Sequence, residues 1–271
     1  LAHDDLLSLY DDAKFDVIVS NFQCTKSANP AWLSRHKIVE SKGGIRVGIL
    51  GLTVPFNPYY HLLGWHIESV FESLEKELEK IIDQTDVIVL LSHLGIYEDE
   101  RIAKQFSEID VIIGGHTHHL LRSGEVVGNT LLTAAGKHCA HVGEVSITFD
   151  HETKSIVKKE AVTSEIDAFH RDLRTEQRIG ELQEQADVIL AKKIIDVDEP
   201  IKVNWFQETE IMKKFTEELQ NWTKADGAFL NSGLLLDEFA AGEITYRDVH
   251  RNCPHPINPC IVELTGEALY E

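Results

Sequence analysis

The chain has 271 residues, of which 43% are hydrophobic, and it carries a formal net charge of −19 at pH 7. This length is sufficient for two domains, and the four Trp and eleven Phe residues can fill hydrophobic cores. The strongly acidic balance argues against a polyanionic partner such as DNA, RNA or an anionic membrane surface. Since no stretch approaches the roughly twenty apolar residues of a membrane-spanning helix, neither a nucleic acid polymer nor a membrane is expected as a partner.

Strands and helices are predicted to alternate through the first part of the chain. Short β-branched apolar runs indicate strands, and apolar residues at helical spacing between charged ones indicate amphipathic helices. The predicted elements are strands at 15–20 and 45–54, a helix over 67–81, a strand at 86–92, a helix near 98–106 and a strand at 109–113. This β-α-β-α-β order is typical of a layered α/β domain.

Three further segments are predicted as consecutive antiparallel strands that form a second sheet. They lie at 130–135, 142–149 and 155–162, and the middle one alternates between apolar and polar residues. Sequence after them becomes charged, with an apolar helical stripe that is interpreted as a linker helix. A helix around 211–222 then opens a second domain.

The predicted domain bounds follow from this change of character. The first domain is placed at 1–165, the linker helix at 166–199 and the second domain at 200–271.

The four cysteines, Cys24, Cys139, Cys253 and Cys260, are few and scattered for a chain of this size. Such usage favours a reducing cytosol over a secreted disulfide framework, which predicts a cytoplasmic location. The segment from Cys253 to Cys260 also contains His255, but its spacing matches no common structural zinc pattern. A rigid loop bounded by prolines is the favoured interpretation of that segment.

Three histidines follow a predicted buried strand. This strand ends in Gly114 and Gly115, after which come His116, His118 and His119. Glycine allows backbone angles that residues with a Cβ resist, so the chain is expected to turn sharply there. His116 and His118 are two residues apart and would point the same way in an extended segment. Neutral imidazole is the commonest protein metal ligand.

A second predicted strand, at 86–92, leads directly into His93. In open α/β sheets, ligands bind beyond the carboxyl ends of the strands. Two strands that both lead into histidine therefore favour one shared metal site made by His93, His116 and His118. The alternative is that these are ordinary loop histidines, which would be the better interpretation of any one of them alone.

The sequence resembles a known family in four places. LSHLG (91–95), followed by GGHTHH (114–119), resembles the last two metal motifs of the calcineurin-like metallophosphoesterases. The segments at 229–249 and 261–271 resemble the start of the 5′-nucleotidase C-terminal domain. Together they indicate the two-domain 5′-nucleotidase family. The resemblance implies an α/β fold in which a two-sheet sandwich flanked by helices precedes a partial α+β C-terminal domain.

The resemblance also implies roles for the histidines. His93 and His116 would be ligands of one metal ion and His118 a ligand of a second, the ions being divalent metals such as Mn, Zn or Fe. The family's D-x-H, Gly-Asp and G-N-H-[DE] motifs supply the bridging carboxylate and the catalytic histidine, and they do not occur at the start of this chain. The single D-x-H match, 248–250, falls in the second domain and is assigned no metal role. We therefore expect a fragment that binds metal weakly by itself, and no catalytic residue is assigned.

The second domain departs from the family pattern. The family's N-x-G-x-x-R segment resembles 231–236, where Asn231 is kept and Leu236 replaces the arginine. Gln207 replaces another arginine, and His255 stands where an aromatic side chain would stack on the base. Leucine cannot provide the bidentate recognition of a guanidinium group. Asn231 and His255 are the candidate substrate-binding residues, although Asn followed by Ser-Gly is equally an ordinary turn signal.

Three functions stay open from the sequence. The first is a metal-dependent phosphoesterase of 5′-nucleotidase type that hydrolyses a nucleotide-like phosphomonoester through a water activated by two metal ions. The second is a related 2′,3′-cyclic phosphodiesterase, and the third is a catalytically inactive member or fragment that acts as a binding module. The net charge does not exclude a small phosphate-ester substrate, because bound cations supply local positive charge.

Overall fold

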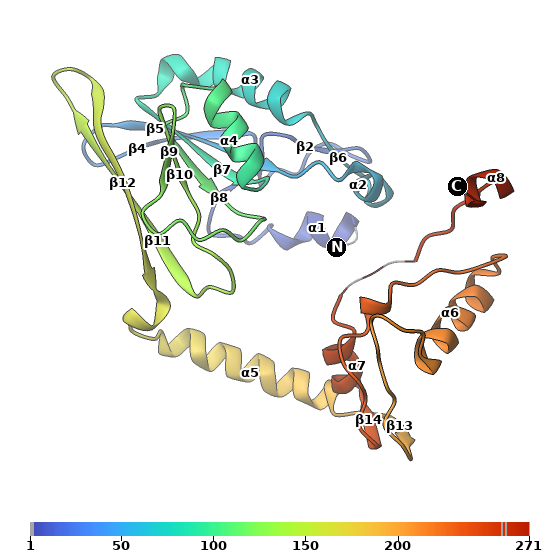
Figure 1. The fold of residues 1–271 in the computed structure, drawn as a ribbon. Coiled ribbons are helices and arrows are strands. Elements are labelled where there is room, and N and C mark those ends of the chain that lie inside the picture. Colours follow the sequence, from blue (N-terminus) through green and yellow to red (C-terminus); the bar gives the residue numbers. More distant parts are fainter. Residues whose placement is uncertain (1–2, 256, 258, 271) are drawn as a thin grey trace. The chain divides into compact units, whose positions relative to one another are not determined.

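The protein is described by a computed structural model that covers residues 3–255, 257 and 259–270 (Figure 1). The chain divides into two compact units, Leu1–His170 and Arg171–Glu271. The division falls inside the segment expected to link the two domains, and the domain bounds given above remain a prediction. The mixed α/β architecture expected from the sequence is confirmed.

The first unit is built on a six-stranded sheet with the strand order β4-β5-β7-β8-β10-β9. The four central strands run parallel, whereas the edge strands β4 and β9 pair antiparallel with their neighbours. Parallel strands are buried on both faces, which explains their near-continuous runs of Val, Ile and Leu. The bounds are His36–Glu40 for β4, Arg46–Thr53 for β5, Val87–His93 for β7, Val111–Gly114 for β8, Glu125–Val127 for β9 and Thr130–Thr133 for β10.

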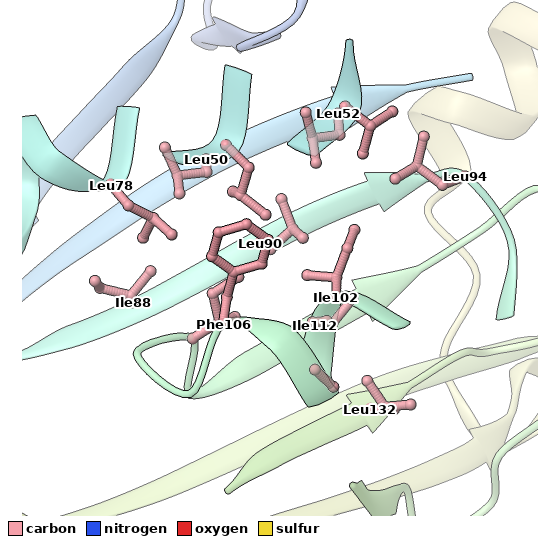
Figure 2. Packing of buried hydrophobic residues seen from close by; sticks show 14 of the residues in the cluster. Leu50, Leu52, Leu78, Ile88, Leu90, Leu94, Ile102, Phe106, Ile112 and Leu132 are labelled. Atoms are coloured by element: carbon pink, nitrogen blue, oxygen red, sulfur yellow. The ribbon is translucent and has the colours of Figure 1, made fainter. Parts of the chain in front are cut away.

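Helices α3 (Val70–Ile81) and α4 (Ile96–Gln105) cover one face of this sheet (Figure 1). Both lie on the same face because right-handed crossovers that add strands in one direction place their helices on one side. The side chains between the helices and the sheet form a closely packed core (Figure 2). Its members include Leu50, Leu52, Leu74, Leu78, Ile81, Ile88, Leu90, Ile102, Phe106, Ile112 and Leu132.

The prediction that β10 pairs antiparallel with the strands after it is wrong. β10 joins the main sheet parallel to β8, with Leu131 opposite Val111. Leu131 and Leu132 are both buried, as a strand covered on two faces requires. β11 (His141–Asp150) and β12 (Ser155–Glu165) pair antiparallel with each other as a separate two-stranded ribbon.

Short strand pairs adjoin β5 at the carboxyl edge of the sheet. Gly51 is needed here, because an added Cβ would lie 1.9 Å from the carbonyl oxygen of Ile18. The buried Asn21 side chain accepts from the Thr53 N–H (3.0 Å) and donates to the Thr53 carbonyl (2.8 Å), which fixes the segment after β1 to the end of β5. The remaining elements of this unit are α1 (His3–Leu9), β1 (Val17–Ile18), β2 (Phe22–Cys24), β3 (Leu33–Ser34), α2 (Asn57–Leu63) and β6 (Trp65–Ile67), with 3-10 turns η1 (Ile82–Gln84) and η2 (Ile166–Ala168).

A buried ion cluster joins α3 to the start of β4 and to the residue before it. The Glu77 carboxylate is fully buried and accepts from Arg35 Nε (3.0 Å), His36 Nδ1 (2.7 Å) and Lys80 Nζ (2.7 Å). Arg35 also pairs with Glu68. Burial by itself raises the pKa of Glu77, but the hydrogen bonds from Lys80 and His36 outweigh it and hold this pKa below its ordinary value.

We expect Glu77→Ala to lower the free energy of unfolding by about 2–3 kcal/mol. Removing one partner of a buried charge cluster leaves the others unpaired, and the loss is moderated because Arg35 and Lys80 are partly exposed. Urea denaturation followed by circular dichroism measures the change. Glu75→Ala, on the exposed side of the same helix, is the control and should cost less than about 0.5 kcal/mol. Equal losses for the two variants would contradict a stabilising role of the cluster.

The second unit contains the long helix α5 and a two-stranded antiparallel sheet made by β13 and β14. The helix α7 (Tyr246–Asn252) begins with a capping box, in which the Thr245 and Asp248 side chains bond to each other's backbone N–H. Within the described residues, no helix is both long and apolar enough to span a bilayer. The other elements are α5 (Leu173–Leu190), β13 (Lys193–Val197), α6 (Glu210–Thr223), the 3-10 turn η3 (Ser232–Leu234), β14 (Gly242–Thr245) and α8 (Gly266–Tyr270).

Candidate metal site

The carboxyl ends of β7 and β8 bring two of the predicted ligands together. The strands are parallel neighbours in which Ser92 lies opposite Gly114. His93 is the last residue of β7, and His116 follows the end of β8 by two positions. Their imidazole rings have centroids 5.1 Å apart and planes inclined at 67°. His93 also lines a cavity of about 360 Å³ at this edge of the sheet.

His118 contributes to the electrostatics of the same place. Partial burial lowers the pKa of the His93 imidazole below its ordinary value, and the neighbouring His116 and His118 lower it further. A lowered pKa keeps His93 neutral near pH 7, which is the protonation state that binds metal. His116 and His118 thus both lie within electrostatic reach of His93, and the rings of His93 and His116 are in direct proximity.

Gly114 and Gly115 were predicted to make the turn through backbone angles that residues with a Cβ resist, but left-handed angles occur instead at the histidines. Neither Gly114 nor Gly115 has a positive φ, whereas His116 (65°) and His118 (57°) are both left-handed. His116 and His118 are therefore not in the extended conformation in which residues two apart point the same way. Close approach restricts this position, since an added Cβ on Gly115 would lie 3.2 Å from His93 Nδ1 and the imidazole would have to shift by a few tenths of an ångström.

Left-handed backbone in residues with a Cβ is costly and persists only where surrounding contacts fix it. Thr117 provides such a contact between the two histidines. Its Oγ1 accepts from the N–H of Ile96 (3.1 Å), the first residue of α4, and bonds to Nδ1 of His119 (2.9 Å). The turn that carries His116 and His118 is thereby attached to the start of the helix.

Asp99 is a buried carboxylate that the sequence interpretation did not single out. It lies on α4, is 2% exposed, and accepts a hydrogen bond from Ser92 Oγ. An added Cβ on Gly114 would lie 2.6 Å from Asp99 Oδ2. Its position three residues after the start of α4 carries no metal-ligand signal, so only the tertiary contacts reveal that it touches both strand ends.

Burial raises the pKa of Asp99 from 3.8 to about 6, and the neighbouring Glu98 charge adds to the rise, whereas the Ser92 hydrogen bond opposes it. Between these two values the folded protein holds more protons than the unfolded chain. The free energy of unfolding should therefore fall as the pH rises from about 4 to about 6.

Asp99→Asn should remove this component of the pH dependence, because an amide does not titrate. The component amounts to at most about 3 kcal/mol, at about 1.4 kcal/mol per pKa unit. Urea unfolding of both proteins at a series of pH values from about 4 to about 7 measures it. If the difference between wild type and variant stays constant over that range, Asp99 does not titrate there.

The donors found here are an incomplete set for a metal ion. Within the residues that the structure describes, no three His, Cys, Asp or Glu side chains are grouped closely enough to hold one. Two adjacent imidazoles with a third nearby fit partial ligation. The weak affinity of the chain for metal stays a prediction.

In the second unit, the two candidate substrate-binding residues line one cavity of about 910 Å³. Its walls are mostly apolar and include Phe215, Trp222 and Phe229. The Asn231 Oδ1 accepts from the Gly233 N–H (2.8 Å). This side chain therefore stabilises the turn through its oxygen, as the turn interpretation of Asn231 expected.

The two positions that replace family arginines lie elsewhere. Leu236 lines a cavity of about 310 Å³ beside Trp205, and Gln207 lines another of about 440 Å³ beside α6. Neither cavity includes Asn231 or His255 among its described lining residues. The structure therefore groups Asn231 with His255 and separates them from Leu236 and Gln207.

Known proteins resemble both parts of the chain. Residues 179–271 match the family described as 5′-nucleotidase, C-terminal domain. The whole chain aligns with the uncharacterized metallophosphoesterase YunD of Bacillus subtilis (strain 168), at 40% identity over 272 residues and 59% of that protein's length. The suspected relationship to metallophosphoesterases and 5′-nucleotidases is thus confirmed.

Solved structures resemble the fold. A putative 5′-nucleotidase from Staphylococcus aureus superposes with a TM-score of 0.68 at 22% identity, over 90% of this chain and 51% of its own. The 5′-nucleotidase precursor from Thermus thermophilus gives a TM-score of 0.63 at 22% identity, over 92% of this chain and 55% of its own. At this identity they support the fold alone. The chain spans little more than half of the length of these relatives.

Proposed function

We propose that the chain forms part of a metal-dependent phosphoesterase that hydrolyses a small phosphomonoester. Its similarity to the Bacillus subtilis metallophosphoesterase and its match to the 5′-nucleotidase C-terminal domain support this proposal. The observation that carries this proposal is the proximity of His93 and His116 at the carboxyl ends of two adjacent parallel strands. Such strand ends are where open α/β sheets bind their ligands. Two divalent ions, such as Mn, Zn or Fe, would supply Lewis acidity and an activated water to such an enzyme.

The histidines have distinct roles in this proposal. His93 and His116 would hold one ion, and His118 would be a ligand of a second. Partial burial lowers the pKa of His93 and keeps it neutral and ready to bind. The left-handed backbone at His116 and His118 presents both imidazoles from one short turn that Thr117 anchors to α4.

The second unit is proposed to bind an organic group in the cavity lined by Asn231 and His255. Asn231 can still donate hydrogen bonds through its amide, since Gly233 engages its oxygen. His255 offers a ring to stack or to hydrogen bond, and the apolar walls of the same cavity accept a flat or aliphatic group. These features support a small organic phosphate as substrate, with weak selection for a nucleoside.

We expect the chain alone to show no appreciable hydrolysis of p-nitrophenyl phosphate with added Mn²⁺ or Zn²⁺. A longer protein in which the family's D-x-H, Gly-Asp and G-N-H motifs precede Leu1 should hydrolyse it, lose activity with EDTA and regain it with Mn²⁺. The reason is that three imidazoles lack the bridging carboxylate that holds two ions about 3.5–4 Å apart.

Variants of that longer protein test the assigned ligands. His116→Ala should lower kcat/KM at least about 100-fold, beyond the usual effect of losing an outer contact to a ligand. His151→Ala, an exposed histidine between β11 and β12, is the matched control and should leave kcat/KM within about twofold. Robust turnover by the chain alone, abolished by His116→Ala, would contradict the need for further ligands.

The same longer protein should prefer AMP over glycerol phosphate by no more than about tenfold in kcat/KM, or about 1.4 kcal/mol. Each missing arginine pair removes about 1.5–3 kcal/mol of recognition, and a missing base stack removes about 1–3 kcal/mol. Steady-state kinetics with both substrates measure the ratio. A preference in the thousands would show that other groups, such as Asn231, Arg247 or Arg251, bind the nucleoside.

A further inference from the structure

We propose that Asp99 is a positioning residue that sets the separation between the strand ends carrying His93 and His116. The inference rests on the proposed function in so far as those imidazoles are metal ligands. Asp99 belongs to neither strand, since it lies on α4, the helix that connects them. One side chain from the connecting helix therefore contacts both of the strand ends that form the site.

The first contact is made to β7. One Asp99 carboxylate oxygen accepts from the Ser92 hydroxyl, and Ser92 is the residue before His93. The same hydroxyl oxygen accepts from the N–H of Leu94, the residue after His93, at 3.2 Å. The backbone on both sides of His93 is thus held through one hydroxyl group to Asp99.

The second contact is made to β8. The other carboxylate oxygen of Asp99 lies so close to Gly114 that an added Cβ would be 2.6 Å away. Gly114 precedes His116 by two residues. Since the carboxylate is packed against the strand at this point, no side chain can replace the glycine unless Asp99 moves.

Burial sets Asp99 apart from a surface carboxylate. Asp99 is 2% exposed and Ser92 is 6% exposed. No Lys or Arg of the described residues forms an ion pair with Asp99, although a buried carboxylate is costly without such a partner.

Asp110 is a matched control at the opposite end of β8. It also is a largely buried carboxylate that contacts the neighbouring strand, since it accepts from the N–H of Ile88 (2.9 Å). It differs in having Lys159 as a countercharge at 3.7 Å and in lying at the end of the sheet away from His93. An alanine substitution at either position removes one buried carboxylate, but only the change at Asp99 is near the two imidazoles.

The test that needs no metal is a nuclear Overhauser effect between the ring protons of His93 and His116, measured on the full chain at a temperature where all variants are folded. We expect the signal in wild type and in Asp110→Ala, and at least about a twofold loss in Asp99→Ala. Asp99→Asn should restore it, because the amide oxygen can still accept from Ser92. If Asp99→Ala does not fold, Ser92→Ala gives the same comparison by removing only the hydroxyl.

The second readout is the affinity of the chain for Co²⁺, titrated by its visible absorption. Asp99→Ala should weaken it about 10–100-fold, the usual effect of losing an outer contact to a metal ligand, while Asp110→Ala should leave it unchanged. If the Co²⁺ affinity of wild type is too weak to titrate, the same comparison is made in the longer protein, and the ring-proton signal decides the role of Asp99 in either case. An unchanged signal in Asp99→Ala, or an equal loss in Asp110→Ala, would overturn the inference.

Discussion

Parallel pairing between β7 and β8 is the constraint on which the candidate site depends. The backbone hydrogen bonds place Ser92 opposite Gly114, so the residues that follow each strand leave the sheet at the same edge. Contacts of the Asp99 and Thr117 side chains then fix the residues that this backbone pairing has brought together. Without this register, no packing interaction would bring His93 and His116 together, because both side chains are exposed and neither is part of the hydrophobic core.

Much of the first unit could be predicted from the sequence because its signals are local. The periodicity of α3 and the apolar runs of β5, β7 and β8 follow from burial of these elements alone. The partner of β10 could not be predicted, since an apolar run does not say which strand it pairs with.

In the candidate site, too, the features that depend on local sequence could be predicted and those that depend on distant residues could not. The positions of His93 and His116 at strand ends follow from local pattern, and so does their shared edge. The reason for Gly114 does not, because it depends on Asp99, a residue of the connecting helix. The left-handed backbone at His116 could not be predicted either, because the turn is held by a hydrogen bond from α4 to Thr117.

The crossover through α4 makes the site depend on a contact between residues that are distant in the sequence. Ser92 and Gly114 are separated in sequence by the whole of this helix, so their pairing requires closure of the loop that contains it, at a cost in chain entropy. In any partly folded state with an open crossover, the rings of His93 and His116 are apart. If His93 and His116 hold a metal ion as proposed, that ion would bind only the state in which the two rings are together and would stabilise it by mass action. The bound ion would then stabilise the pairing of β7 with β8 in addition to the backbone hydrogen bonds between them.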